Sequence, residues 1–408
     1  MRRVVVTGMA GLSPLGHCWP EVEANLRASA SAVRRMPDWD LFEGLNTRLA
    51  APLERFAVPA SYDRKRTRSM GRVALLATRA SELALRAAGL LGDPILTSGR
   101  AGVAYGSSSG SPPAISDLAG MLRSRSTDTI KANTYIQMMP HTTAANVSVF
   151  FGINGRLIPS STACTSGSLA IGAAFEAIRY GKQTVMVAGG AEELCPSQAA
   201  VFDALFATST RNDEPATTPR PFDVARDGMV VGEGAATFVL EELEHARARG
   251  AQVTAEVVGF GTNCDGQHVT QPSAATMAVA LQLALEDAGL APEQIGYVNG
   301  HGTATDLGDV AESLATLEAL RRPVPISSLK SYMGHTLGAC GSLEAWMTVE
   351  MMNTGWFAPT INLAHVDPRC AELDYIVGAG RELETEYVMT NNFAFGGVNT
   401  SLIFRRWG

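Results

Sequence analysis

The sequence predicts a layered α/β fold built from two similar halves, and three features of the chain lead to this prediction. An alanine-rich helical pattern closes twice with nearly the same heptapeptide, Ala-Leu-Arg-Ala-Ala-Gly-Leu at 84–90 and Ala-Leu-Glu-Asp-Ala-Gly-Leu at 284–290. A short strand pattern follows each heptapeptide, at 101–106 and at 295–300. The third feature is a nearly all-apolar helical pattern that occurs once in each half.

These two apolar helices belong in the interior of the protein. The first is expected over 165–180, where Gly181 ends it, and the second over 336–353, followed by Gly355. A helix that is apolar on all sides is stable only when other elements cover it completely. One such helix per half therefore favours a layered arrangement around a pseudo-twofold axis.

The length of 408 residues exceeds the usual size of a single core. We therefore expect an N-terminal half over 1–250 and a C-terminal half over 251–408. Residues 111–150, rich in Ser, Thr, Pro and Met, are expected to be an insertion that caps a pocket or contacts another subunit.

Composition narrows the class of protein further. Hydrophobic residues make up 46 % of the chain, and the net charge of −7 makes nucleic acid an unsuitable partner. No apolar run approaches the ~18 residues of a membrane span. The six cysteines are scattered without a Cys-x-x-Cys motif, a pattern typical of a reducing cytoplasmic location.

Cys164 is the first candidate for a reactive group, because it lies among small polar residues just before the first apolar helix. Thr162, Ala163 and Thr165 flank it and leave room for a substrate. A helix N-terminus carries roughly half a positive charge, which lowers the pKa of a thiol and favours the thiolate. The pattern favours an acyl-accepting nucleophile over a buried core cysteine.

Two histidines between glycines and threonines form the second part of the expected site. His301 follows the strand at 295–300, and α/β folds place ligand groups at the carboxyl ends of such strands. Thr303 and Thr305 can hydrogen-bond a polar substrate, and Asp309 can accept a hydrogen bond from the backbone or a histidine.

The second histidine, His335, lies between Lys330 and Glu344. Glu344 falls inside the second apolar helix, where a carboxylate costs several kcal/mol unless it is paired. Lys330 is the nearest cation in the sequence outside that helix. We therefore predict an ion pair between Lys330 and Glu344 that fixes the loop carrying His335.

A final motif lies near the C-terminus, at 391–399 (Asn-Asn-Phe-Ala-Phe-Gly-Gly-Val-Asn). Phe395 precedes two glycines and is a candidate for a hinged aromatic gate. Its backbone N–H and that of Cys164 are candidates for an oxyanion hole. No spacing of His, Cys and Asp matches a metal site, so none is predicted.

These motifs resemble those of the elongating β-ketoacyl-acyl-carrier-protein synthases, which belong to the thiolase superfamily. The resemblance runs from Val4-Val-Val-Thr-Gly to the final strand, and the motifs occur in the family's order. It implies the thiolase-like five-layered αβαβα fold with internal duplication and an enzyme without metal or organic cofactor. It also implies a homodimer, or a heterodimer with a related subunit.

The resemblance assigns roles residue by residue. Cys164 matches the acyl-accepting cysteine, and His301 and His335 match the histidines of the decarboxylation site. Lys330 and Glu344 match the charged pair beside them. The resemblance further implies a gating role for Phe395 and contacts with substrate at Thr303, Thr305, Asp309, Ser109, His268 and Thr270.

The implied reaction is a decarboxylating Claisen condensation. Acyl carrier protein delivers an acyl group to Cys164, and a malonyl group on a second carrier loses CO2 while His301 and His335 donate hydrogen bonds to its thioester oxygen. The resulting enolate attacks the Cys164 thioester and gives a β-ketoacyl carrier protein, as in fatty-acid, polyene or polyketide elongation. Ser109 stands where members that elongate long saturated chains carry an apolar residue, which favours a polyene, aryl or polyketide chain.

Two alternatives keep the fold and change the function. One is a non-autonomous binding subunit of a heterodimeric ketosynthase. The other is a thiolase-type acyltransferase, which needs a second cysteine near the C-terminus that the segment 391–399 lacks.

The acidic carrier protein is expected to dock on local positive charge, because the chain is acidic overall. The densest basic cluster contains Arg64, Lys65 and Arg68. A second candidate cluster consists of Arg123, Arg125 and Lys131.

Overall fold

The computed structural model describes all 408 residues and contains one continuous sheet of eleven strands. Its order is β13-β11-β10-β15-β16-β9-β1-β8-β6-β4-β5. The N-terminal half supplies β1 (Val4–Leu12), β4 (Ala101–Gly106), β5 (Leu157–Ser160), β6 (Val185–Glu192) and β8 (Gly234–Glu242). The C-terminal half supplies β9 (Ala255–Cys264), β10 (Ile295–Asn299), β11 (Pro325–Ser327), β13 (Asp374–Tyr375), β15 (Tyr387–Phe393) and β16 (Val398–Arg406).

The two halves share one strand topology, which confirms the predicted duplication. In the first half, β1 and β6 lie antiparallel to β8, whereas β4 lies parallel to both β6 and β5. In the second half, β9 and β15 lie antiparallel to β16, whereas β10 lies parallel to both β15 and β11. Within the eleven-stranded sheet, the short pairing of Val4–Val6 with Ala255–Val257 joins the halves. The boundary near residue 250 stays a prediction.

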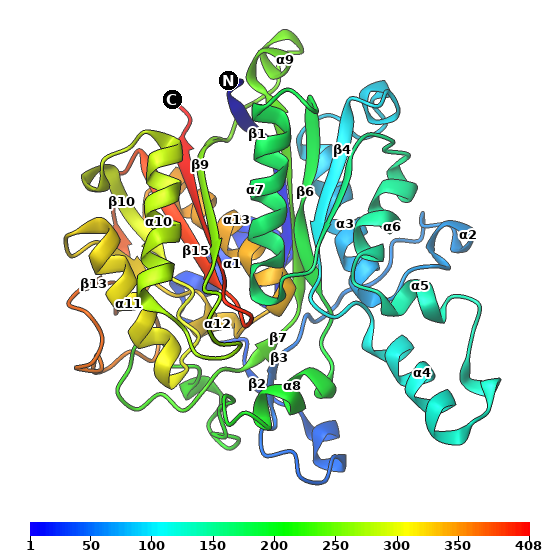
Figure 1. The fold of residues 1–408 in the computed structure, drawn as a ribbon, viewed down its shortest axis with the longest axis horizontal. Helices are drawn as coiled ribbons and strands as arrows, with labels where there is room; N and C mark the ends of the chain where they lie inside the picture. Colours follow the sequence, from blue (N-terminus) through cyan, green and yellow to red (C-terminus); the bar gives the residue numbers. More distant parts are fainter.

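Six helices complete five layers, as Figure 1 shows from left to right. The outer layers are α10 (Ala274–Ala288) with α11 (Asp306–Leu320), and α3 (Arg72–Ala87) with α6 (Thr142–Phe151). Between the two half-sheets lie α7 (Ser166–Arg179) and α13 (Cys340–Thr354). These two central helices are the apolar helices expected from the sequence, and the αβαβα prediction is confirmed.

The two central helices approach each other through glycines at equivalent positions. A Cβ atom on Gly167 of α7 would lie 2.8 Å from the backbone nitrogen of Ser342, and one on Gly341 of α13 would lie 2.7 Å from that of Ser168. Both distances are too short for a side chain. The absence of side chains at these glycines therefore lets the N-termini of α7 and α13, and the turns before them, meet.

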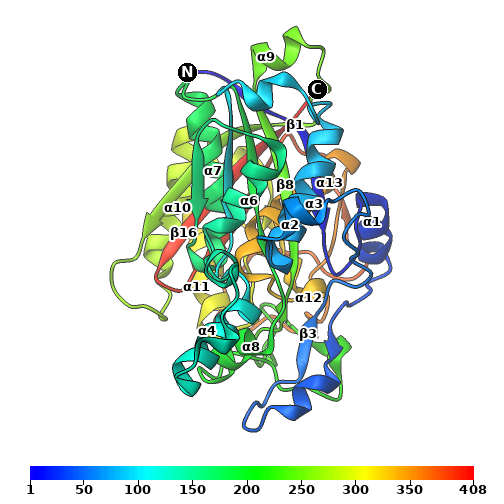
Figure 2. The same ribbon diagram turned by 90° about the vertical axis from the view of Figure 1, so that its right-hand side faces the viewer.

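The segment 111–150 is helical. Its last helix, α6, packs against β4 and β5, whereas α4 (Pro112–Ser124) and α5 (Thr134–Met138) project beyond the layers (Figure 1). Figure 2 shows α4 and α8 (Pro196–Asp203) at the end of the molecule opposite both termini.

The remaining elements are short. The sheet β2-β3-β7 contains β2 (Arg34–Arg35), β3 (Leu49–Ala51) and β7 (Val231–Gly232), and β12 (Trp356–Phe357) pairs with β14 (Arg381–Glu382). The other helices are α1 (Trp19–Arg27), α2 (Arg64–Thr67), α9 (Leu243–Ala248) and α12 (Lys330–Met333). No helix combines the length and apolar character needed to cross a membrane.

Candidate active site

Cys164 lies on a tight turn between β5 and α7. The preceding residue, Ala163, has φ of 51°, a left-handed conformation that costs an L-residue roughly 1–2 kcal/mol. Cys164 is only 7 % exposed and lines a cavity of about 510 Å³. The turn therefore presents the thiol to an enclosed space at the N-terminus of a buried helix.

His335 is held by its backbone and by one ring nitrogen. Its N–H donates to the carbonyl of Val230 (2.6 Å), and its carbonyl accepts from the N–H of Gly232 (2.8 Å), which attaches it to β7. The N–H of Leu337 donates to Nδ1 of His335 (3.0 Å). Because Nδ1 is an acceptor, the proton of the neutral ring lies on Nε2, which is buried and has no hydrogen-bond partner.

His301 has the same tautomer, but side-chain donors set it instead of a backbone N–H. It follows β10, and its backbone N–H donates to the Glu312 carboxylate (2.5 Å) on α11. Nδ1 of the His301 ring lies 3.0 Å from the Lys330 ammonium and 3.3 Å from the side-chain amide of Asn392. Both neighbours are donors, so the neutral His301 ring also carries its proton on Nε2.

The predicted ion pair is present behind the histidines. Nζ of Lys330 lies 2.5 Å from a carboxylate oxygen of Glu344, and both side chains are buried. Asn392 donates to the other oxygen of Glu344 (2.8 Å). A buried pair of this kind is stable only when its remaining donors and acceptors form hydrogen bonds, and Asn392 and His301 are the partners in those bonds.

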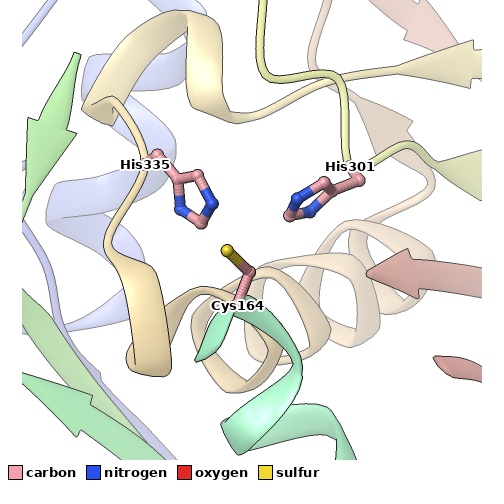
Figure 3. Close-up of side chains that lie close together, drawn as sticks. All are labelled: Cys164, His301 and His335. Atoms are coloured by element: carbon pink, nitrogen blue, oxygen red, sulfur yellow. The ribbon is translucent and has the colours of Figure 1, made fainter. Parts of the chain in front are cut away.

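The three reactive groups converge, as Figure 3 shows, with the Cys164 sulfur facing the two imidazoles. One ligand-type atom from each of Cys164, His301 and His335 lies within 4.8 Å of the other two. The imidazole centroids are 5.1 Å apart and the rings are nearly perpendicular, at 89°. The fold thus places a thiol and two N–H donors around one point.

Electrostatics keep both rings neutral. Burial lowers the pKa of His301 well below its ordinary value, and the nearby Lys330 ammonium and His335 lower it further. Burial and Lys330 act in the same direction on the pKa of His335. Each ring at neutral pH is therefore a hydrogen-bond donor through Nε2 rather than a cation.

The pKa of the Cys164 thiol differs from the value expected from the sequence. Burial raises the pKa of Cys164 to about 11, although the Lys330 charge and the backbone N–H groups of Phe395 and Cys164 oppose this rise. The expectation of a lowered pKa was wrong because desolvation outweighs the field of the helix N-terminus. The backbone N–H groups of Phe395 and Cys164 both point toward the Cys164 sulfur.

The same geometry bears on metal binding. Two buried groups have ligand-type atoms close together: Cys164 with both histidines, and His301 with Cys340 and Glu344. In both histidines, however, a donor occupies Nδ1 and the proton occupies Nε2, so the ring atom facing the thiol has no free lone pair. The ammonium of Lys330 also bonds both Glu344 and His301 in the second group.

Four other predicted residues line the cavity that contains Cys164. Thr303 and Thr305 lie on one wall, and their hydroxyl groups are 2.9 Å apart. Thr270 contributes from the loop after β9. Phe395 is 37 % exposed, and its ring packs against Phe202 of α8 with centroids 5.6 Å apart.

Three predicted substrate-binding residues do not line this cavity. The Asp309 carboxylate is fully buried and accepts from the backbone N–H groups of Phe222, Thr303 and Ala304, so it shapes the threonine wall from behind. The ring of His268 caps its own loop by accepting from the N–H of Thr270 (3.1 Å).

Ser109 is the third of these residues, and it borders a separate cavity of about 840 Å³. Its hydroxyl donates to Glu192 (3.1 Å) and accepts from Gln198 (2.9 Å). Phe206 contributes to the lining of both cavities and is 91 % exposed. The hydroxyl is therefore already bonded and does not end the cavity at Cys164.

Sequence reasoning missed the residues that hold the site from behind. Glu312 accepts from the N–H groups of His301 and Gly302, and Asn392 bonds both Glu344 and His301. Glu312 lies one helical turn after Asp309, and this spacing places both carboxylates on the face of α11 toward the histidine loop. Asn392 lies in the motif at 391–399, where the sequence predicted a role only for Phe395.

The predicted docking residues lie on the surface. Arg64, Lys65 and Arg68 are exposed in and beside α2, and none forms an ion pair. In the second candidate cluster, Arg123 and Arg125 are also exposed, whereas Lys131 pairs with Asp117 (2.9 Å).

Comparison with known proteins agrees with this geometry. The sequence model of the beta-ketoacyl synthase N-terminal domain matches residues 1–246, and that of the C-terminal domain matches residues 254–364. A 3-oxoacyl-[acyl-carrier-protein] synthase 2 from Vibrio cholerae is 41 % identical over 99 % of both chains.

Solved structures show the same relationship. A beta-ketoacyl synthase from Burkholderia phymatum superimposes with a TM-score of 0.99 at 64 % identity, covering 100 % of both chains. A ketosynthase described as bound to a hexaketide, in complex with its type II polyketide acyl-carrier protein, has a TM-score of 0.86 at 30 % identity and full coverage of both chains.

The chain therefore belongs to the β-ketoacyl synthase family. It is a transferase that carries out the decarboxylating condensation of an acyl group with a malonyl group on acyl carrier protein, in fatty-acid or polyketide elongation.

The buried thiol predicts a steep pH dependence of Cys164 alkylation. Because the pKa of Cys164 is raised to about 11, the reactive thiolate should increase about tenfold for each pH unit from about pH 7 to about pH 10. The check is the rate of iodoacetamide labelling at Cys164, followed by intact mass. A rate that is already constant across this range would indicate a thiolate–imidazolium pair and contradict the assigned protonation states.

Proposed function

We propose that Cys164 carries the acyl group and that His301 and His335 promote loss of CO2 from the malonyl group. The arrangement of the two Nε2–H donors beside the thiol supports this assignment most directly. Neutral donors suit an enolate, because they stabilise a developing oxyanion by hydrogen bonds. They also transfer their proton to the oxyanion less readily than an imidazolium would.

In the proposed first step, the Cys164 sulfur attacks the acyl thioester and the carrier's thiol leaves. The backbone N–H groups of Phe395 and Cys164 donate to the carbonyl oxygen as it becomes negative. The Cys164 thiol loses its proton in this step, and the departing carrier thiolate takes up a proton, so that a free carrier thiol is released. The two backbone N–H groups and the Lys330 charge favour the anionic form of the sulfur and oppose the effect of burial.

In the second step, the malonyl thioester oxygen lies between His301 and His335. Cleavage of the bond to the carboxylate carbon releases CO2, and its electron pair forms the enolate that both Nε2–H groups stabilise. The enolate carbon attacks the acyl carbon on Cys164, and the sulfur leaves as a thiolate that takes up a proton from water and restores the thiol. Thr303 and Thr305 line the cavity, which supports a proposed role in hydrogen-bonding the carrier's linear arm.

Neither alternative gains support from the site. A thiolase-type enzyme needs a second thiol facing the substrate. Cys340 is close, but its sulfur donates to the Cys164 carbonyl (3.1 Å), it does not line the cavity, and burial raises its pKa well above the ordinary value. A subunit that only binds would not need the complete set of thiol and paired donors.

The acyl chain is proposed to extend from Cys164 toward the second cavity, which Ser109 borders. This cavity has a mixed wall, since Gln198 and Asp203 line it together with Pro112 and Ile115. Ser109 is small and leaves the volume beside it open. We therefore favour a long or rigid unsaturated, aryl or polyketide chain over a saturated fatty chain.

We also propose a dimer, formed with an identical or a related subunit. The strand β5 is the outer edge of the sheet, and an unpaired edge invites another strand. The adjacent segment 111–150 exposes several large apolar side chains. They are Ile115, Leu122, Ile130, Tyr135, Ile136 and Val149. A cytoplasmic location is proposed as well, because all six cysteines are free.

Substitutions in the reactive trio should separate the two half-reactions. Cys164→Gln should abolish condensation but still release CO2 from malonyl carrier protein, because an amide there mimics the acylated state. His301→Ala and His335→Ala should each lose at least about 100-fold in decarboxylation and still accept an acyl group on Cys164. The checks are CO2 release and intact mass; loss of acylation with normal decarboxylation would reverse the roles.

The size of residue 109 should set the longest product. Ser109→Phe should shorten the product distribution because the ring fills volume in the second cavity. Acylation of Cys164 by a short acyl carrier should be preserved, and Ser109→Ala serves as the control. Mass analysis of carrier-bound products that shows an unchanged distribution from a folded Ser109→Phe enzyme would place the chain along another wall.

Carrier docking should depend on α2. Reversing Arg64, Lys65 and Arg68 to Glu should raise the apparent KM for carrier-bound substrate about tenfold and leave reaction with a small acyl thioester unchanged. The comparison variant reverses Arg123 and Arg125, which are equally exposed. Equal losses with carrier-bound and small substrates would show that α2 is not the docking surface.

A further inference from the structure

A buried carboxylate that the reaction does not use links the loop after β4 to the turn before α13. Glu192 ends β6 and is fully buried, and it forms no ion pair. Burial raises its pKa, and the donors around it oppose that rise. A buried carboxyl group without a paired cation must be stabilised by its hydrogen bonds.

Those hydrogen bonds come from two separate loops. From the loop after β4, the hydroxyls of Ser107 (3.2 Å), Ser108 and Ser109 (3.1 Å) and the N–H of Ser108 (2.8 Å) all donate to the carboxylate. From the C-terminal half, the N–H of Gly338 donates to the same group (3.1 Å). Glu192 therefore connects the loop after β4, which contains Ser107, Ser108 and Ser109, to the turn that precedes α13.

The turn at Gly338 controls His335. Leu337 has φ of 49°, and its N–H donates to Nδ1 of His335, which fixes the ring tautomer. The next N–H in the chain, that of Gly338, points at Glu192. A continuous path thus runs from Ser109, at the second cavity, through Glu192 and the Leu337–Gly338 turn to the imidazole of His335.

We propose that Glu192 is a positioning residue for decarboxylation, which holds the Leu337–Gly338 turn so that the Leu337 N–H meets Nδ1 of His335. The inference rests on the proposed role of His335. It also means that the loop Ser107–Ser109, which binds Glu192, helps to support the histidine that acts on the malonyl group. Removal of the carboxylate would leave two backbone N–H groups, those of Ser108 and Gly338, buried without an acceptor.

The test compares three variants in the Cys164→Gln background, which isolates decarboxylation. Glu192→Leu, which has no acceptor, should lower kcat for CO2 release from malonyl carrier protein at least about tenfold, with KM within about twofold. Glu192→Gln should restore kcat to within about threefold of the parent. Its oxygen can face the two N–H groups, and its amide can donate to serine hydroxyls that turn to accept.

The matched control is Glu193→Leu. Glu193 is the neighbouring buried carboxylate, but it accepts from the N–H of Val73, away from the site, so decarboxylation should stay within about threefold. In the presence of native Cys164, Glu192→Leu should be alkylated at a rate within about twofold of the parent enzyme. Equal losses of decarboxylation and alkylation, or unchanged decarboxylation in Glu192→Leu, would overturn the proposal.

Two further points keep the result interpretable. If Glu192→Leu does not fold, Gly338→Ala disturbs the same junction from the other side, because its Cβ would lie 2.6 Å from the backbone nitrogen of Ser108 and 2.7 Å from the Glu192 carboxylate. The same loss of kcat with normal alkylation is expected, and normal decarboxylation would count against the proposal. Failure of Cys164→Gln itself to release CO2 would instead contradict the roles assigned to the histidines.

Discussion

The buried ion pair of Lys330 and Glu344 determines the chemistry of the site. An ammonium among apolar and neutral groups would be unstable alone, and Glu344 compensates it at 2.5 Å. The charge is then close enough to hold Nδ1 of His301 as an acceptor and to lower the pKa of both histidines. Burial lowers the pKa of both histidines most, and the ammonium adds to this effect, so the cavity contains two neutral donors.

The duplicated fold explains how a nucleophile and its partners meet. The turns before α7 and α13 are equivalent, and each contains a residue with left-handed φ, Ala163 in one and Leu337 in the other. In the first half the turn presents a thiol, and in the second half it fixes an imidazole. Because Gly167 and Gly341 allow the two helix N-termini to touch, these different functions lie on either side of the pseudo-twofold axis.

The sequence predicted the parts of the site that are carried by short motifs. Cys164 and His301 stand out locally, and Glu344 stands out because a charge interrupts an apolar helix. Glu312, Asn392 and Glu192 could not be identified in this way. Each acts on a backbone or ring that a different strand or helix supplies, so its partner is known only after the layers are assembled.

The relative size of opposing effects on one residue also limited what the sequence could predict. The N-terminus of α7 does favour a thiolate, yet full burial has the larger and opposite effect on the pKa of Cys164. At Ser109 the residue type was read correctly as small and polar, but its hydroxyl is bonded to Glu192 and Gln198. Both outcomes depend on competition between neighbours that a linear pattern does not contain.

The central claim is that both active-site imidazoles are neutral and carry their proton on Nε2, facing the thiol. The most direct measurement is two-dimensional 1H–15N correlation NMR of the protein with 15N-labelled histidines, assigned with His301→Ala and His335→Ala. We predict a protonated-type Nε2 and an unprotonated Nδ1 for both rings from about pH 6 to about pH 8. An Nδ1–H tautomer, or an imidazolium for either ring in this range, would contradict the account.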